Sequence, residues 1–157
     1  MDTMAREFGV AKSIPPHLTY HLGEYATAAA LPAALEQLAA GITAFEVAIT
    51  GFGVFTGPKP VLYLTVVRGP CLVAVHEAIG RLMDGLGLPN HSFYAAPAWV
   101  PHVTLAIQHV SREAFPTVAA WLRDQDLQFR AQVDNLVLAR EGGESIVVLG
   151  SYPLREA

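Results

Sequence analysis

Two short stretches of the chain share one pattern, and together they decide the fold. The first is PPHLTYHLG, residues 15–23, and the second is VPHVTLAIQ, residues 100–108. Each contains Pro-His-x-Thr followed by apolar residues, and the histidines, His17 and His102, stand 85 positions apart. A repeated motif of this kind indicates a duplicated architecture, so the extent of the repeat comes first.

The repeat continues after both motifs. Apolar residues spaced i, i+4, i+7 predict a helix over residues 30–40 and another over 114–124, each with a proline in its first turn. Strand-like segments follow, and in chain order they are residues 44–55, 60–69, 128–139 and 144–153. Each half is therefore expected to run strand, helix, strand, strand.

A further helical stripe links the two copies. Apolar residues recur at helical spacing over residues 71–87, which end in glycines. We therefore expect one bilobal α+β domain, residues 1–157, in which antiparallel strands are backed by helices. Its lobe-forming repeats are about residues 15–69 and 100–153, related by a pseudo-two-fold axis, so that the two His-containing strands face a central cleft.

Composition bounds the class of protein. With 52% hydrophobic and only 15% charged residues, a chain of 157 residues can bury the core of a globular domain. No apolar run approaches the length of a spanning helix and no secretory signal is visible, so we expect a cytoplasmic protein with no membrane partner. Cys71 is the only cysteine, which excludes an internal disulfide and a metal site built from several cysteines.

The net charge narrows the class of partner. A formal charge of −4 argues against a protein that binds a long nucleic acid tract, because such binding neutralises many phosphates with Lys and Arg. A small phosphodiester substrate or an RNA terminus stays compatible with this charge. The sequence gives no indication of the oligomeric state.

The paired motifs carry groups suited to phosphodiester chemistry. Side chains two apart in a strand point to the same face, so His17 projects with Thr19, and His102 projects with Thr104. Two imidazoles can activate an attacking oxygen and protonate a departing one. Two hydroxyls can donate hydrogen bonds to phosphoryl oxygens as charge develops on them. Such a displacement requires no metal and no cofactor.

These motifs resemble those of a known family. PHLTY and PHVTL, with GFGVF and LYLTVVR between them, are similar to the 2H phosphoesterase superfamily, specifically its 2′-5′ RNA ligase and 2′,3′-cyclic nucleotide phosphodiesterase family. The resemblance covers nearly the whole chain from Pro15 to Pro153. It implies a bilobal α+β fold and a cofactor-independent hydrolase that acts on RNA termini, as a cyclic phosphodiesterase or by reversible 2′-5′ joining.

The resemblance also implies roles for four residues. His17 and His102 are the expected acid and base, and Thr19 and Thr104 are the expected phosphate-binding groups. We expect His102 to activate the water and His17 to protonate the leaving oxygen, although the repeat makes the two roles nearly interchangeable. In the family a strand and a helix usually precede the first motif, whereas only 16 residues precede His17. Either the first lobe lacks them or translation starts upstream.

Other residues have two interpretations each. His21 follows on the face of His17 and Thr19, so it either extends the cleft or is a polar residue at a strand end. Three aromatic residues lie in the loop before the second motif, and either stack a base or pack against the body: Phe93, Tyr94 and Trp99.

The remaining polar candidates are not predicted as site residues. Arg68 and Arg130 match the geometry of phosphate, but most such arginines are solvated. The other three histidines are expected to be structural: His76, His91 and His109.

Two alternatives come from other classes of protein. A metalloenzyme could use His17, His21 and His102 as ligands, but neither motif contains the carboxylate that commonly completes such a site. A non-catalytic module could retain the cleft and bind a nucleotide or RNA end without turnover, because fold does not guarantee activity. The natural substrate and the direction of the reaction stay open.

Overall fold

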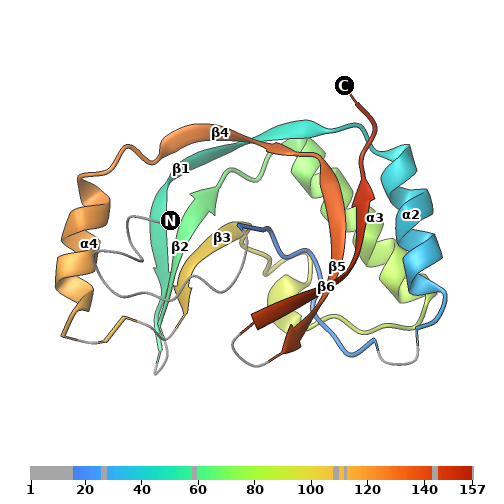
Figure 1. The fold of residues 1–157 in the computed structure, drawn as a ribbon, viewed down its shortest axis with the longest axis horizontal. Helices are drawn as coiled ribbons and strands as arrows, with labels where there is room; N and C mark the ends of the chain where they lie inside the picture. Colours follow the sequence, from blue (N-terminus) through green and yellow to red (C-terminus); the bar gives the residue numbers. More distant parts are fainter. Residues whose placement is uncertain are drawn as a thin grey trace.

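The molecule is an α+β structure with one curled antiparallel sheet and a second, smaller sheet (Figure 1). The computed structural model describes residues 16–25, 28–57, 60–107, 110–111, 113–142 and 145–156. Its helices are α2 (Leu31–Gly41), α3 (Pro70–Gly85), the short 3₁₀ helix η1 (Ser92–Tyr94) and α4 (Phe115–Arg123). Its strands are β1 (Phe45–Phe55), β2 (Val61–Val66), β3 (His102–Ile107), β4 (Gln128–Val133), β5 (Asn135–Gly142) and β6 (Ser145–Pro153).

All three predicted helices are confirmed. Each has a proline at its first or second position. That position suits proline because the fixed φ angle fits a helix and no hydrogen bond is lost there. Helix α3 buries the predicted stripe, with Leu72, Val75 and Ile79 facing the core.

The prediction of one strand over residues 128–139 is wrong. The chain divides at Asp134 into β4 and β5, which belong to different sheets. The carbonyl of Asp134 accepts a hydrogen bond at 2.7 Å from the backbone N–H of Leu154, just after β6, rather than from a neighbour in the larger sheet. The backbone therefore leaves one sheet and enters the other within a single residue.

The larger sheet mixes strands from both sequence repeats. The larger sheet has the order β3-β2-β1-β4, so β3 and β4 of the second copy flank β2 and β1 of the first. The smaller sheet is the β5–β6 hairpin, which packs against α2 of the first copy. The sheets therefore do not follow the predicted repeats, and the division into one bilobal domain stays a prediction.

The core lies on one face of the larger sheet and behind the hairpin. Leu62 of β2 packs with Val118 and Leu122 of α4, at the left of Figure 1. Further along the same face, Leu64 and Val66 pack with Trp99 and with Leu72 of α3. A separate cluster joins α2, α3 and the hairpin. The other face of β1, β2 and β3 is left for the site.

None of the helices in the described part of the chain has both the length and the apolar character that crossing a membrane requires.

Candidate active site

The two His-x-Thr motifs lie side by side. Leu18 of the first motif forms an antiparallel bridge with Val103 of the second, at the free edge of the larger sheet. The bridge joins segments separated by 85 positions, and strand-like pairing of the first motif extends no further in the described residues. The adjacency expected from the sequence is therefore present as a local contact.

The bridge determines which side chains share a face. Leu18 and Val103 both pack against the core cluster that contains Trp99. Since side chains alternate along an extended chain, the residues on either side of them point to the opposite face. The antiparallel direction of the bridge makes His17 correspond to Thr104, and Thr19 to His102.

The imidazole of His102 has a defined proton position. Its Nδ1 lies 2.7 Å from the carbonyl oxygen of Val100. A carbonyl oxygen only accepts, so Nδ1 carries the hydrogen and donates it. In the neutral ring Nε2 then holds the lone pair and can accept a proton. The backbone before the motif thus leaves Nε2 as the nitrogen of His102 that can accept a proton.

Two aromatic rings flank His102 on the sheet. The ring centroids of Phe55 and Tyr63 are 4.9 and 5.2 Å from that of His102, and both rings meet it at steep angles. Tyr63 is paired in register with Thr104, and the neighbouring Thr65 is paired with His102. The aromatic pair was missed in the sequence, although alternation in LYLTV puts Tyr63 and Thr65 on one face.

Trp99 holds the backbone of the first motif. Its indole N–H donates to the carbonyl oxygen of Thr19 at 3.0 Å. The Trp99 ring is 2% exposed and stacks on His76, with centroids 3.9 Å apart and planes 4° from parallel. The Arg68 guanidinium lies 5.9 Å from the Trp99 centroid and donates to the carbonyl oxygen of Ala96 at 2.8 Å. These contacts give Trp99 a packing role rather than exposing it to a base.

His76 is a structural histidine, as expected. It is 4% exposed, and its Nε2–H donates to the carbonyl oxygen of Tyr94 at 2.8 Å. Burial lowers its pKa, the nearby Arg68 charge lowers it further, and the bond to Tyr94 and the Glu77 charge oppose this. The neutral imidazole is therefore favoured in the folded protein.

His21 does not continue the strand face of the motif. The chain leaves extended pairing after Leu18, and the Nδ1 atom of His21 is hydrogen-bonded to the hydroxyl of Tyr25. Burial lowers the His21 pKa, while the Asp84 charge acts in the opposite direction. His21 is thus oriented toward Tyr25 and helix α3, and its predicted place in the cleft gains no support from these contacts.

The other candidates lie elsewhere. Phe93 is 72% exposed and its ring contacts His91. The side chain of His91 accepts a hydrogen bond from the backbone N–H of Phe93, which is a local structural contact. His109 lies outside the described residues.

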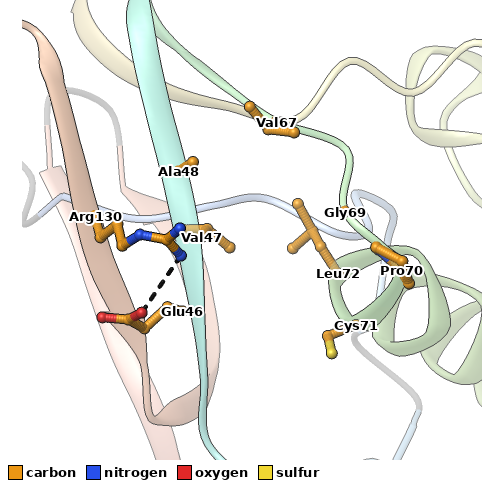
Figure 2. Close-up of a pocket in the computed structure, with 9 residues that line it drawn as sticks. All are labelled: Glu46, Val47, Ala48, Val67, Gly69, Pro70, Cys71, Leu72 and Arg130. Carbon is orange, nitrogen blue, oxygen red and sulfur yellow. Dashed lines mark hydrogen bonds and ion pairs between the residues drawn. The ribbon is translucent and has the colours of Figure 1, made fainter.

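A shallow pocket lies near the first turn of α3, away from the motifs. Figure 2 shows Arg130 of β4 beside it, with its guanidinium directed at Glu46 of β1. That ion pair has a nitrogen–oxygen separation of 3.5 Å. Cys71 is exposed at the pocket, and no motif residue lines it. Among the described residues, no three His, Cys, Asp or Glu side chains gather in a group that could hold a metal ion.

Comparison with known proteins shows the family of the chain. The profile of the 2′-5′ RNA ligase superfamily matches residues 5–144, which is most of the chain. The chain belongs to the 2′-5′ RNA ligase superfamily. Its resemblance to the 2H phosphoesterases is thereby confirmed.

One solved structure has a similar fold. The crystal structure of TT0787 of Thermus thermophilus matches with a TM-score of 0.64 at 23% sequence identity, over 98% of this chain and 87% of that one. At this identity the match shows the fold alone. The comparison with curated proteins gave no significant match.

Proposed function

We propose that this member of the superfamily is a metal-independent phosphodiesterase that opens 2′,3′-cyclic phosphates on nucleotides or at RNA termini. The observation that carries the proposal is the bridge between Leu18 and Val103, because it pairs the two motifs at the sheet edge. Side-chain alternation around this bridge would direct two imidazoles and two hydroxyls to one face. Superfamily membership supports the same chemistry. The substrate would occupy the central cleft that the sequence predicts, over the face that carries the motifs.

The two histidines would act on opposite sides of the phosphorus. Nε2 of His102 removes a proton from water, and the water oxygen forms a bond to phosphorus. The bond from phosphorus to the 3′ oxygen breaks, and protonated His17 gives its proton to that oxygen. The products are a 2′-phosphate and a 3′-hydroxyl, and a proton passes from His102 to His17 through solvent before the next turnover. The fixed Nδ1–H of His102 favours this assignment.

The two threonines would stabilise the charge of the transition state. Their hydroxyls donate to the two non-bridging oxygens, from Thr19 on one strand and Thr104 on the other. Donors fixed by the backbone need no reorganisation as charge develops, and removal of one such donor typically costs about 100-fold or more in kcat. The backbone of Thr19 is fixed in this way by its bond from Trp99.

A direct assay tests the proposal. The chelator-treated protein is incubated with 2′,3′-cyclic mononucleotides and with oligonucleotides that end in a cyclic phosphate. We expect turnover to persist after chelation and to be lost in His17→Ala and in His102→Ala. His91→Ala is the matched control, because it removes an exposed imidazole that lies outside the motifs.

Each rival outcome has its own signature. Activity that disappears with chelator and returns with added metal would support a metalloenzyme instead. Binding of nucleotides with no turnover by the wild-type protein would support a non-catalytic module. Joining of two oligonucleotides through a 2′-5′ bond in the same assay would show that a 5′-hydroxyl can replace water as the group that attacks the cyclic phosphate.

A further inference from the structure

Phe55 and Tyr63 form an aromatic surface beside the motif face. Their rings stack with centroids 4.2 Å apart and planes at 26°, and both contact the ring of His102. Neither ring belongs to the apolar core clusters, whereas Phe52 and Val54 of the same strand do. The pair is half-buried and lies on the face that carries the motifs.

A glycine lets the Tyr63 ring lie across the sheet. Gly53 is the register partner of Tyr63, and a Cβ atom added at Gly53 would lie 2.5 Å from the Cζ atom of the ring. Any other residue would push the ring off the strand. With glycine there, Tyr63 covers β1 and meets Phe55 near the end of that strand.

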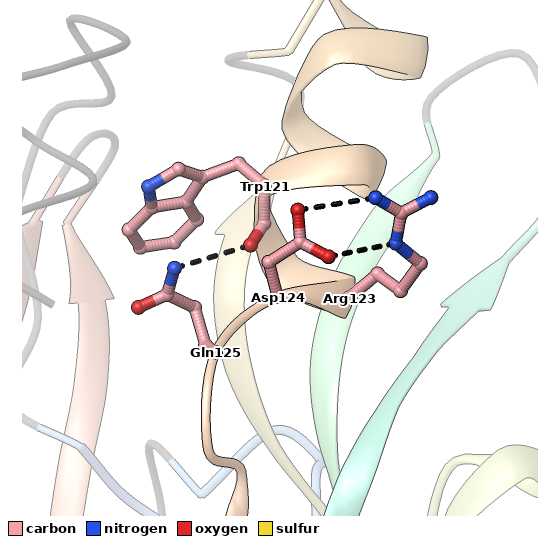
Figure 3. Close-up of polar contacts among 4 residues, drawn as sticks. All are labelled: Trp121, Arg123, Asp124 and Gln125. Atoms are coloured by element: carbon pink, nitrogen blue, oxygen red, sulfur yellow. Dashed lines mark hydrogen bonds and ion pairs between the residues drawn. The ribbon is translucent and has the colours of Figure 1, made fainter.

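The positive charge available to a long RNA is small in the described part of the chain. Three of its arginines are paired with carboxylates. Figure 3 shows both carboxylate oxygens of Asp124 held by Arg123 at the end of α4, with Gln125 bonded to the carbonyl of Trp121. The other two pairs are Arg81 with Glu77 and Arg130 with Glu46. Arg68 and Arg155 donate to neutral oxygens, of Ala96 and Thr43, and keep their charge.

We infer that Phe55 and Tyr63 form a stacking platform for the base of a nucleoside 2′,3′-cyclic phosphate, so that the substrate is a single nucleotide rather than a long RNA. The inference rests on the proposed function, since His102 fixes the position of the phosphate next to the platform. Aromatic stacking accepts every base, because each base has a π face. The protein would recognise such a substrate by one stacked base and one phosphate, and not by a tract of phosphates.

The experiment compares a substrate with a base to one without. Adenosine 2′,3′-cyclic phosphate and methyl riboside 2′,3′-cyclic phosphate share the reacting group and differ in the aromatic base. We expect the wild-type protein to prefer the adenosine compound, and the ratio of the two kcat/KM values to fall about tenfold in Phe55→Leu and in Gly53→Ala. The ratio cancels any general loss of activity caused by the contacts with His102.

Three variants complete the design. Tyr63→Phe keeps the stacking ring and should retain the wild-type ratio, whereas Tyr63→Leu should lose it. Phe93→Leu is the matched control, because it removes an exposed aromatic ring that contacts His91. A ratio that stays at the wild-type value in Phe55→Leu, Tyr63→Leu and Gly53→Ala would overturn the platform.

Substrate length gives an independent test. An oligonucleotide of about ten residues with a terminal cyclic phosphate should be turned over no better than the mononucleotide, and with little dependence on salt. A preference for the oligonucleotide above about tenfold, weakened steeply by salt, would overturn the single-nucleotide assignment.

Failure of the platform and failure of the proposed function are distinguishable. If the wild-type protein turns over neither compound, the proposed function fails, and the platform is then tested by equilibrium binding of adenosine 2′-monophosphate. Loss of that binding in Phe55→Leu, with folding verified by circular dichroism, supports the platform. Equal binding by the variant and the wild-type protein overturns it.

Discussion

The indole N–H of Trp99 donates a hydrogen bond to the backbone carbonyl of Thr19 across 80 positions of sequence, at 3.0 Å. Trp99 therefore connects the loop before the second motif to the backbone of the first. The position of Thr19 depends on this bond as well as on the bridge between Leu18 and Val103. A change at Trp99 should act on the proposed site without touching substrate.

Trp99→Phe tests this relationship. The variant keeps an aromatic ring against His76 but removes the donor to Thr19. We expect the free energy of unfolding to fall by about 1 kcal/mol. We expect kcat for a cyclic nucleotide to fall by about tenfold, because small misplacements of a positioning group are costly in the transition state. Urea denaturation and steady-state kinetics measure the two effects. Unchanged kcat would show that the bond does not position the motif.

The tautomer of His102 is a second prediction. Since Nδ1–H donates to Val100, the neutral ring should carry its hydrogen on Nδ1 and leave Nε2 unprotonated. Nitrogen NMR of the protein labelled in histidine reports the two ring nitrogens separately. His102→Ala identifies the resonance by its disappearance. A neutral ring protonated on Nε2 would contradict the assignment of His102 as the base.

From the burial of His76 we predict how the free energy of unfolding depends on pH. Burial lowers its pKa, so between that lowered value and the ordinary value of about 6.5 the unfolded chain binds the proton more readily than the folded one. The contribution of His76 to stability is therefore complete above about pH 6.5 and is lost as the pH falls below it. His21, whose pKa is also lowered by burial, acts in the same direction.

His76→Phe separates this contribution from the rest. Phenylalanine keeps the stack on Trp99 but does not titrate, and the Tyr94 carbonyl still accepts a hydrogen bond from Asn90 at 3.0 Å. Unfolding free energies between about pH 5 and pH 8 should depend less on pH in the variant than in the wild-type protein. If the unfolding free energy changes equally with pH in the variant and in the wild-type protein, His76 does not cause the pH dependence.

Leu122 tests the packing of α4 against the sheet. It is 2% exposed and packs with Leu62 and Val118. Truncation to alanine leaves a cavity, and we expect the free energy of unfolding to fall by about 2 to 5 kcal/mol. Chemical denaturation checks this value. The ratio of activities on adenosine and methyl riboside cyclic phosphates should stay unchanged, because Leu122 is on the core face.

Local patterns were enough to predict the helices and most of the strands. The helices follow from prolines and apolar spacing, and the strands follow from alternation and β-branched residues. The common face of His17 and Thr19 stays a prediction from alternation in an extended chain. These features depend on residues within a few positions of each other, which is where sequence patterns are informative.

Contacts over long distances could not be predicted in the same way. Nothing near Trp99 indicates that its indole bonds to Thr19. The pairing of β3 with β2 depends on packing of the whole chain, and so does the change of sheet at Asp134. Gly53 and Tyr63 offered a signal, since alternation in GFGVF and LYLTV puts a glycine and a tyrosine on facing strands, but the pairing register was needed to interpret it.

The interleaving of the two repeats has a consequence for how the protein assembles. Strands β3 and β4 come late in the chain and flank the earlier pair β2 and β1, so the contacts of the site have high contact order. Such contacts form slowly, because the entropy cost of closing a long loop comes before the contacts can stabilise the chain. During synthesis the site would thus be completed only after the second motif has emerged, and neither half alone would contain both histidines.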